Sequence, residues 1–147
     1  MKSPSELSAE DRRFRTEFEA CRFPPAEFGH RAHVRLAYSY LAEHDTDTAH
    51  QLMRRALLGF LQHHGIDISK YHETITRAWI LAVRHFMELS PDCESSDDFI
   101  EKNPLLLDSK IMMTHYSAEV LFSDEARAQF VEPNLSPIPR HGNGGNS

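Results

Sequence analysis

The sequence predicts an all-α protein, an up-down helical bundle of about four main helices with a short C-terminal helix and an extended strap. Two observations indicate this class. Apolar residues recur with the period of a helix along most of the chain, whereas the alternation typical of strands is almost absent. Proline stands at the edges of the periodic segments, and glycine is scarce, with 6 residues in 147.

The first two helices are predicted on either side of a proline break. One is expected over residues 9–19, where Ser8 is a suitable N-cap because its hydroxyl can accept a hydrogen bond from the first turn. Its few apolar residues indicate a surface helix that covers one edge. Pro24 and Pro25 interrupt regular structure, and the second helix is expected from about residue 27 or 29 to 43.

Two longer helices follow, joined by short connections. The third is expected over residues 48–64, where Gly65 supplies a C-terminal stop. The fourth is expected over residues 71–89, before Ser90 and Pro91. Because short connections make neighbouring helices antiparallel, the start of the second, the end of the third and the start of the fourth should lie at one end of the bundle.

The C-terminal part has weaker patterns. Residues 98–102 are typical of a helical turn, and residues 105–113 are apolar enough to pack on the bundle. Ser123 is a suitable N-cap for a short helix to about residue 130. Residues 132–139, with the sequence EPNLSPIP, predict an extended strap.

Composition limits the class of protein. The length predicts a single helical domain over residues 1–140, followed by a disordered glycine-rich tail over residues 141–147. The net charge of -6 argues against a nucleic-acid partner. No apolar run approaches the roughly 18 residues of a membrane span. Two cysteines are too few for a disulfide scaffold or a cysteine-based metal cluster, and we expect a cytoplasmic protein with reduced thiols.

Histidine, with 10 residues, is the compositional feature that points to chemistry. On a helical wheel of about 100° per residue, His30 and His33 lie one turn apart in the apolar stripe of the second helix. His72 lies in the apolar stripe of the fourth helix. His63 and His64 end the third helix, so the predicted topology gathers all five at one end of the bundle.

Three of these histidines form a candidate metal site. Imidazole is the commonest protein ligand of metals, and His30, His33 and His72 would leave one position open for water or substrate. Zinc, iron, manganese and nickel all fit as the divalent transition metal. Iron favours a carboxylate as third ligand; Glu27 and Glu73 are nearest in sequence, although Glu73 is expected on the polar side of its helix. We therefore predict a metal-dependent enzyme that acts on a small-molecule substrate, with the reaction type open.

Three further residues are candidate catalytic groups. Tyr71 can donate a proton or a hydrogen bond, Thr76 can orient His72 or a substrate, and His115 can be a fourth ligand or a general base if its segment closes over the bundle end. Each has a structural alternative. Tyr71 can be a half-buried packing residue, Thr76 can bind the carbonyl four residues before it, and a histidine in an apolar stripe can bind a carbonyl.

Other functions stay open beside the metal-dependent enzyme. A metal-free enzyme would use His33 or His72 as general base, with a pH–rate limb near neutrality. A non-catalytic accessory or binding protein would expose an apolar surface, including the face of a possible homodimer. Haem ligation by His30 or His72 is a fourth alternative.

Four segments carry a resemblance. FGHRAHVRLAYSYL and YHETITRAW, with the later HYSAEVLFSDEAR and VEPNLSPIP, resemble segments of small uncharacterised bacterial helical proteins over most of residues 28–139. The resemblance implies a bacterial protein and supplies no functional residues. A helical bundle with three histidines is also similar in architecture to the DinB-like metalloenzymes, although the order and spacing of the histidines differ.

Overall fold

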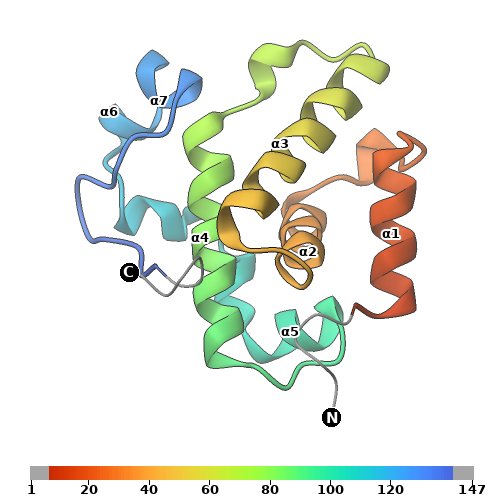
Figure 1. Ribbon diagram of the computed structural model, residues 1–147. Helices are drawn as coiled ribbons and strands as arrows, with labels where there is room; N and C mark the ends of the chain where they lie inside the picture. The colour runs from red at the N-terminus through yellow and green to blue at the C-terminus, as the bar shows by residue number, and fades with distance from the viewer. Residues whose placement is uncertain (1–6, 141–147) are drawn as a thin grey trace.

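The computed structural model describes residues 7–140, and all regular structure within that range is helical (Figure 1). The prediction of an all-α protein is confirmed. The predicted tail over residues 141–147 lies outside the described residues. The longer helices are α1 (Ala9–Glu19), α2 (His30–Leu41), α3 (Thr46–His63), α4 (Glu73–Leu89) and α5 (Ser96–Lys102). The shorter ones are α6 (Ala118–Leu121), α7 (Asp124–Ala128) and the 3₁₀ helices η1 (Pro25–Glu27), η2 (Ile68–Lys70), η3 (Pro104–Leu107) and η4 (Ser109–Thr114).

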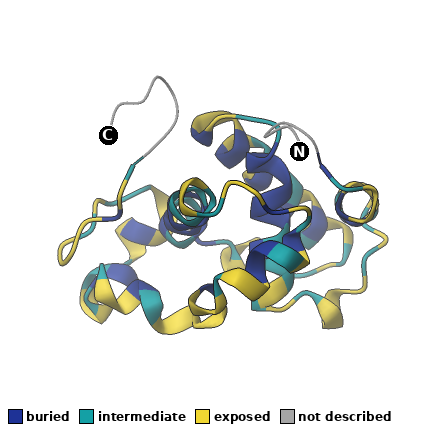
Figure 2. Cartoon of the chain, turned by 90° about the horizontal axis from the view of Figure 1, so that it is seen from below, coloured by how far each residue is buried: buried dark blue, intermediate teal, exposed yellow. Residues whose placement is uncertain are grey.

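Three helices form the centre of the bundle. α2, α3 and α4 pack against one another, α1 packs on α2 and α3, and α7 packs on α4 at the opposite side of the molecule (Figure 1). Buried residues are concentrated on the facing sides of these helices (Figure 2). The largest fully buried side chains include Tyr40, Tyr116, Phe18, Phe99, Leu36 and Met53.

Capping side chains set several helix boundaries. The Ser8 hydroxyl accepts a hydrogen bond from the backbone N–H of Asp11 at 3.1 Å, and α1 begins and ends where the sequence predicts. Asp45 caps α3 in the same way, so this helix begins two residues before the predicted start. Gly65 follows α3 with a φ of +68°, the left-handed conformation that favours glycine and ends a helix.

Two predicted boundaries are wrong for local reasons. The second helix does not begin at residue 27 or 29, because Pro25–Glu27 close a separate 3₁₀ turn; α2 therefore begins at His30 and ends at Leu41. The fourth helix does not begin at residue 71. His72 has extended dihedral angles, φ -131° and ψ 111°, and is the N-cap of a helix that begins at Glu73.

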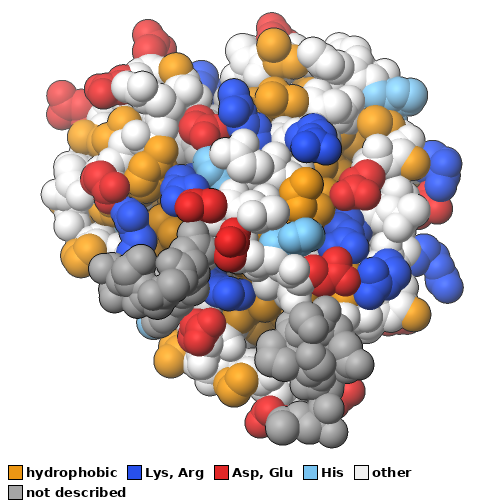
Figure 3. All heavy atoms as spheres, viewed as in Figure 1, with side chains coloured by type: hydrophobic (Ala, Val, Ile, Leu, Met, Phe, Trp, Pro, Cys, Tyr) orange, Lys and Arg blue, Asp and Glu red, His pale blue; other side chains and the backbone are white. Residues whose placement is uncertain are grey.

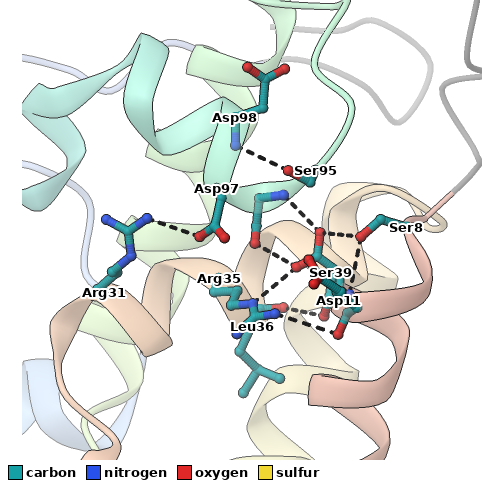
Figure 4. Close-up of polar contacts among 11 residues, drawn as sticks. Ser8, Asp11, Arg31, Arg35, Leu36, Ser39, Ser95, Asp97 and Asp98 are labelled. Atoms are coloured by element: carbon teal, nitrogen blue, oxygen red, sulfur yellow. Dashed lines mark hydrogen bonds and ion pairs between the residues drawn. The ribbon is translucent and has the colours of Figure 1, made fainter.

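A buried carboxylate joins three helices near the N-terminus (Figure 4). Asp11 in α1 is 1% exposed and accepts hydrogen bonds from Arg35 of α2 at 3.0 Å and from the backbone N–H of Ser96 in α5 at 2.7 Å. The hydroxyl groups of Ser96 and Ser8 add two more, at 2.5 and 2.9 Å. This network fixes α1 and α5 against the central helices.

The chain after α7 runs without helix over residues 129–140, which confirms the predicted strap. Thr74 of α4 holds its start, since the hydroxyl donates to the Gln129 carbonyl at 2.9 Å and accepts from the Val131 N–H at 3.0 Å. Tyr116 donates to the Val131 carbonyl at 2.6 Å. The short helix α6, between η4 and α7, has no counterpart in the sequence prediction.

The outer surface carries both signs of charge. On the face seen in Figure 3, acidic and basic side chains are interspersed among apolar ones. Within residues 7–140, no helix combines the length and the apolar character needed to cross a membrane.

Candidate ligand-binding site

Two adjacent cavities lie at the end of the bundle where the histidines were expected to meet. Cavity A, of about 500 Å³, lies between α2, α4 and the η4–α6 segment, and its walls include Trp79 and Met112. Cavity B, of about 380 Å³, lies between the start of α2, the end of α3 and the start of α4. Phe28, His33 and Ile75 line both cavities and therefore separate them.

The antiparallel topology brings some of the predicted site residues to these cavities. His30 and His33 line cavity A, and His33 and His72 line cavity B. His63 and His64 are in the walls of neither cavity. The ring of His64 packs against the edge of Phe60, with 4.5 Å between centroids. The expected gathering at one bundle end therefore includes three histidines in the cavity walls.

His72 is held by the fold at both ring nitrogens. Nδ1 accepts a hydrogen bond from the Ile75 backbone N–H at 3.1 Å and so caps α4, and Nε2 donates to the Leu121 carbonyl at 2.8 Å. Burial lowers the pKa of His72, while the contact with Leu121 opposes that shift. The imidazole is therefore neutral and has no nitrogen lone pair left for a metal in this arrangement.

His30 is held at one nitrogen. Its Nε2 donates to the Leu106 carbonyl at 2.8 Å, and its ring meets Trp79 edge to face with 4.6 Å between centroids. The rings of His30 and His33 are nearly parallel, with centroids 6.4 Å apart. His30 thus fits the structural alternative, a histidine bound to a backbone carbonyl.

His33 differs from both, because its ring makes no hydrogen bond within residues 7–140. It packs against Phe28, with 6.1 Å between centroids, and lines both cavities. Burial, together with the nearby His30, lowers the pKa of His33 to about 4. At neutral pH this imidazole is uncharged and offers one donor and one acceptor.

Tyr71 and Thr76 line cavity B and are both bound to protein groups. The Tyr71 hydroxyl donates to the Glu73 carboxylate at 2.6 Å. Burial and this hydrogen bond raise the pKa of Tyr71 far above its usual value, so the hydroxyl stays protonated. The Thr76 hydroxyl donates to the His72 carbonyl at 2.8 Å, which is the structural alternative expected for a helical threonine.

A buried polar network behind cavity B has no counterpart in the site prediction. Glu73 is not on a solvated face: its side chain is 15% exposed and lies 3.1 Å from Nε2 of buried His50. This Nε2 has no hydrogen-bond partner within residues 7–140, so its contact with Glu73 is electrostatic. Nδ1 of His50 accepts from Arg77 at 3.0 Å. On a helical wheel, His50 lies at the margin of the core face of α3, which is the sequence signal that could have indicated this network.

His115 lies in the contact between η4 and the strap. Its ring Nδ1 donates to the Ser136 carbonyl at 2.7 Å, and its backbone carbonyl accepts from Leu135 at 2.9 Å. It lines neither cavity. The structure therefore places this candidate base away from the other site residues, where it holds the strap.

The three predicted metal ligands do not form a ligand set in this arrangement. Within residues 7–140, no group of three or more histidine, cysteine or acidic side chains is positioned to hold a metal ion. His72 is engaged at both nitrogens and His30 at one. The site instead consists of two apolar cavities with an uncharged, unbonded imidazole between them.

The fold and site thus define a small helical protein with a divided apolar cavity. No protein-family model matches the chain, and neither the curated proteins nor the solved structures contain a match.

Proposed function

We propose that this protein binds a small, largely apolar molecule in cavities A and B, and that His33 makes the direct polar contact with it. One observation carries the proposal: His33 lines both cavities and keeps its hydrogen-bonding capacity, whereas His30 and His72 are bound to backbone groups.

The shape and chemistry of the cavities support binding. Their volumes lie within the range of about 300–1,000 Å³ typical of small-molecule sites. Aromatic and aliphatic side chains dominate the walls, with Phe28 and Ile75 common to both and Trp79 in cavity A. Apolar walls with a few polar groups are the usual composition of a ligand pocket.

Fluorescence of N-phenyl-1-naphthylamine, an uncharged probe that brightens in apolar surroundings, tests the proposal. We expect saturable binding to the wild type. Ile75→Trp should weaken it, because a larger side chain at a position shared by both cavities narrows each of them. Leu89→Trp is the matched control, since Leu89 ends the same helix and is 64% exposed. Absence of saturable binding to the wild type, or equal binding to both variants, would overturn the proposal.

Metal-free acid–base chemistry is a second candidate, favoured by the unbonded ring of His33. A histidine with a pKa of about 4 is in its basic form throughout the neutral range. If His33 is the general base, the acidic limb of a pH–rate profile should lie near pH 4 and not near neutrality. A limb near neutrality would exclude His33 as that base.

The metal-dependent enzyme stays a prediction from the sequence. A site of His30, His33 and His72 would require His72 to release the helix cap and the Leu121 carbonyl. Metal analysis of protein purified without a histidine tag, with His33→Ala beside it, tests this. About one equivalent of metal in the wild type, lost in the variant, would support the metal site. We propose a cytoplasmic location, in keeping with Cys21 and Cys93 being thiols and not a disulfide.

A further inference from the structure

We infer that cavity B selects an uncharged ligand that donates a hydrogen bond, through an O–H or N–H group on an apolar body. This inference rests on the proposed function and names the class of ligand. It follows from which hydrogen-bonding groups in the cavity wall are already used by the protein and which are left over.

The side-chain donors of cavity B are used within the protein. The Tyr71 hydroxyl donates to Glu73 at 2.6 Å and the Thr76 hydroxyl to the His72 carbonyl at 2.8 Å. The ring N–H of His72 donates to the Leu121 carbonyl, also at 2.8 Å. Because a hydroxyl has one proton and two lone pairs, the oxygens of Tyr71 and Thr76 keep acceptor capacity, part of which the contact between these two hydroxyls uses.

Three backbone donors in the same wall are also used. The N–H groups of Ile66, Tyr71 and Ile75 each donate to a partner in the protein, at 2.9 to 3.1 Å. Among the side chains of the wall, His33 is thus the one that keeps both a donor and an acceptor, while Lys70, which is exposed to solvent, has donors only. Acceptors therefore outnumber donors on the inner surface of cavity B.

Charge favours an uncharged ligand over an ionic one. No carboxylate lines cavity B, so a cation finds no counter-ion in its wall. Lys70 supplies the positive charge in the wall, but it is exposed to solvent, and the Glu73 carboxylate directly behind the Tyr71 hydroxyl opposes an anion in the inner part of the cavity. An uncharged ligand with acceptors alone would leave the remaining lone pairs of Tyr71 and Thr76 without a donor, which costs free energy where water is displaced. A ligand O–H or N–H group removes that cost.

A matched pair of probes tests the inference. 2-Naphthol and 2-methoxynaphthalene share a ring system and differ in the O–H donor. Each is titrated against wild-type protein loaded with N-phenyl-1-naphthylamine, and displacement gives its affinity. We expect 2-naphthol to bind about tenfold more tightly, the effect of one net hydrogen bond.

Two variants locate the effect. Tyr71→Phe removes an acceptor of cavity B and should reduce the preference for 2-naphthol to less than about threefold. Ser109→Ala removes a hydroxyl from the wall of cavity A only and should leave the preference unchanged. Thr76→Val replaces Tyr71→Phe if circular dichroism shows that the latter does not fold.

The outcomes separate this inference from the proposed function. Three outcomes would overturn the inference: equal displacement by the two probes, no displacement by either, or tighter binding of the anion 2-naphthoate. In each case, binding of N-phenyl-1-naphthylamine would still support the proposed function. Failure of N-phenyl-1-naphthylamine to bind would remove both. A preference that survives in Tyr71→Phe and Thr76→Val would also overturn the assignment to cavity B.

Discussion

At the scale of single residues, His72 has a structural task that can be measured. His72→Ala removes the cap of α4 and the hydrogen bond to Leu121. We expect a loss of about 2–3 kcal/mol in the free energy of unfolding, since a cap and a buried hydrogen bond contribute about 1 kcal/mol each and a cavity remains. Urea denaturation at pH 7 measures it.

A second substitution at His72 separates the two contributions. Asparagine is a good N-cap, so His72→Asn should recover about 1 kcal/mol relative to alanine while the Leu121 carbonyl stays unpaired. Equal stabilities of the alanine variant and the wild type would show that the imidazole does not hold α4.

Asp11 is a residue whose charge is tied to folding. Burial alone would raise its pKa, but the hydrogen bonds from Ser96, Arg35 and Ser8 together lower the pKa below its usual value. Asp11→Asn leaves Arg35 without its carboxylate and should destabilise the protein by about 3 kcal/mol at pH 7, as measured by urea denaturation. Glu17→Gln is the control, since the ion pair of Glu17 with Arg22 is exposed and should contribute little. A similar loss in both variants would contradict this reading.

At the scale of elements, the strap depends on one side chain of α4. Thr74→Val removes both hydrogen bonds to residues 129 and 131 and nearly preserves side-chain volume. We expect faster amide hydrogen exchange over residues 129–140, read by mass spectrometry, with a modest loss of about 1–2 kcal/mol in global stability. Thr76→Val is the matched control, because its hydroxyl binds a carbonyl of the chain next to its own helix. Unchanged exchange in Thr74→Val would show that packing alone holds the strap.

Periodicity and capping residues were enough to predict the four main helices, α1 to α4. α1 was predicted with its cap, because Ser8 and the apolar spacing after it are local signals. The bounds of α2 and α4 were missed, since the 3₁₀ turn after Pro24 closes through local backbone hydrogen bonds that periodicity does not reveal, and histidine is not a usual N-cap residue. The cap at His72 forms where Leu121, distant in sequence, supplies the second hydrogen bond.

The sequence predicted where the candidate site lies better than it predicted what each residue does there. Antiparallel connections correctly brought His33 and His72 to one cavity. A helical wheel gives the direction of a side chain but not its hydrogen-bond partner, so it could not separate the free ring of His33 from the bound ring of His72. The contact of Glu73 with His50 joins α3 and α4, and the helical wheel could not predict it for the same reason.

At the scale of the whole molecule, histidines make the fold sensitive to mild acid. Burial is the leading cause that lowers the pKa of His33, His50 and His72 below the usual 6.5, to about 4 for His33. The unfolded chain therefore binds more protons than the native protein between about pH 6.5 and 4. The contribution of these histidines to the free energy of unfolding is fully present above pH 6.5 and is lost as the pH drops through this window. Urea midpoints at pH 7.5, 6 and 5 should decrease in that order.

One variant assigns part of this acid sensitivity to the cavity wall. His33→Gln removes a group whose pKa shift corresponds to a few kcal/mol at most, an upper limit because the residue as a whole is only partly buried. The fall in stability between pH 7.5 and 5 should therefore be smaller in His33→Gln than in the wild type. His44→Gln is the comparison and should keep the wild-type slope, because His44 lies outside both cavities in the turn before α3. Parallel slopes for the wild type and His33→Gln would mean that the ring is hydrated in solution. A bound apolar ligand should steepen the wild-type slope, because it removes water from His33 and makes protonation of the native state still less favourable.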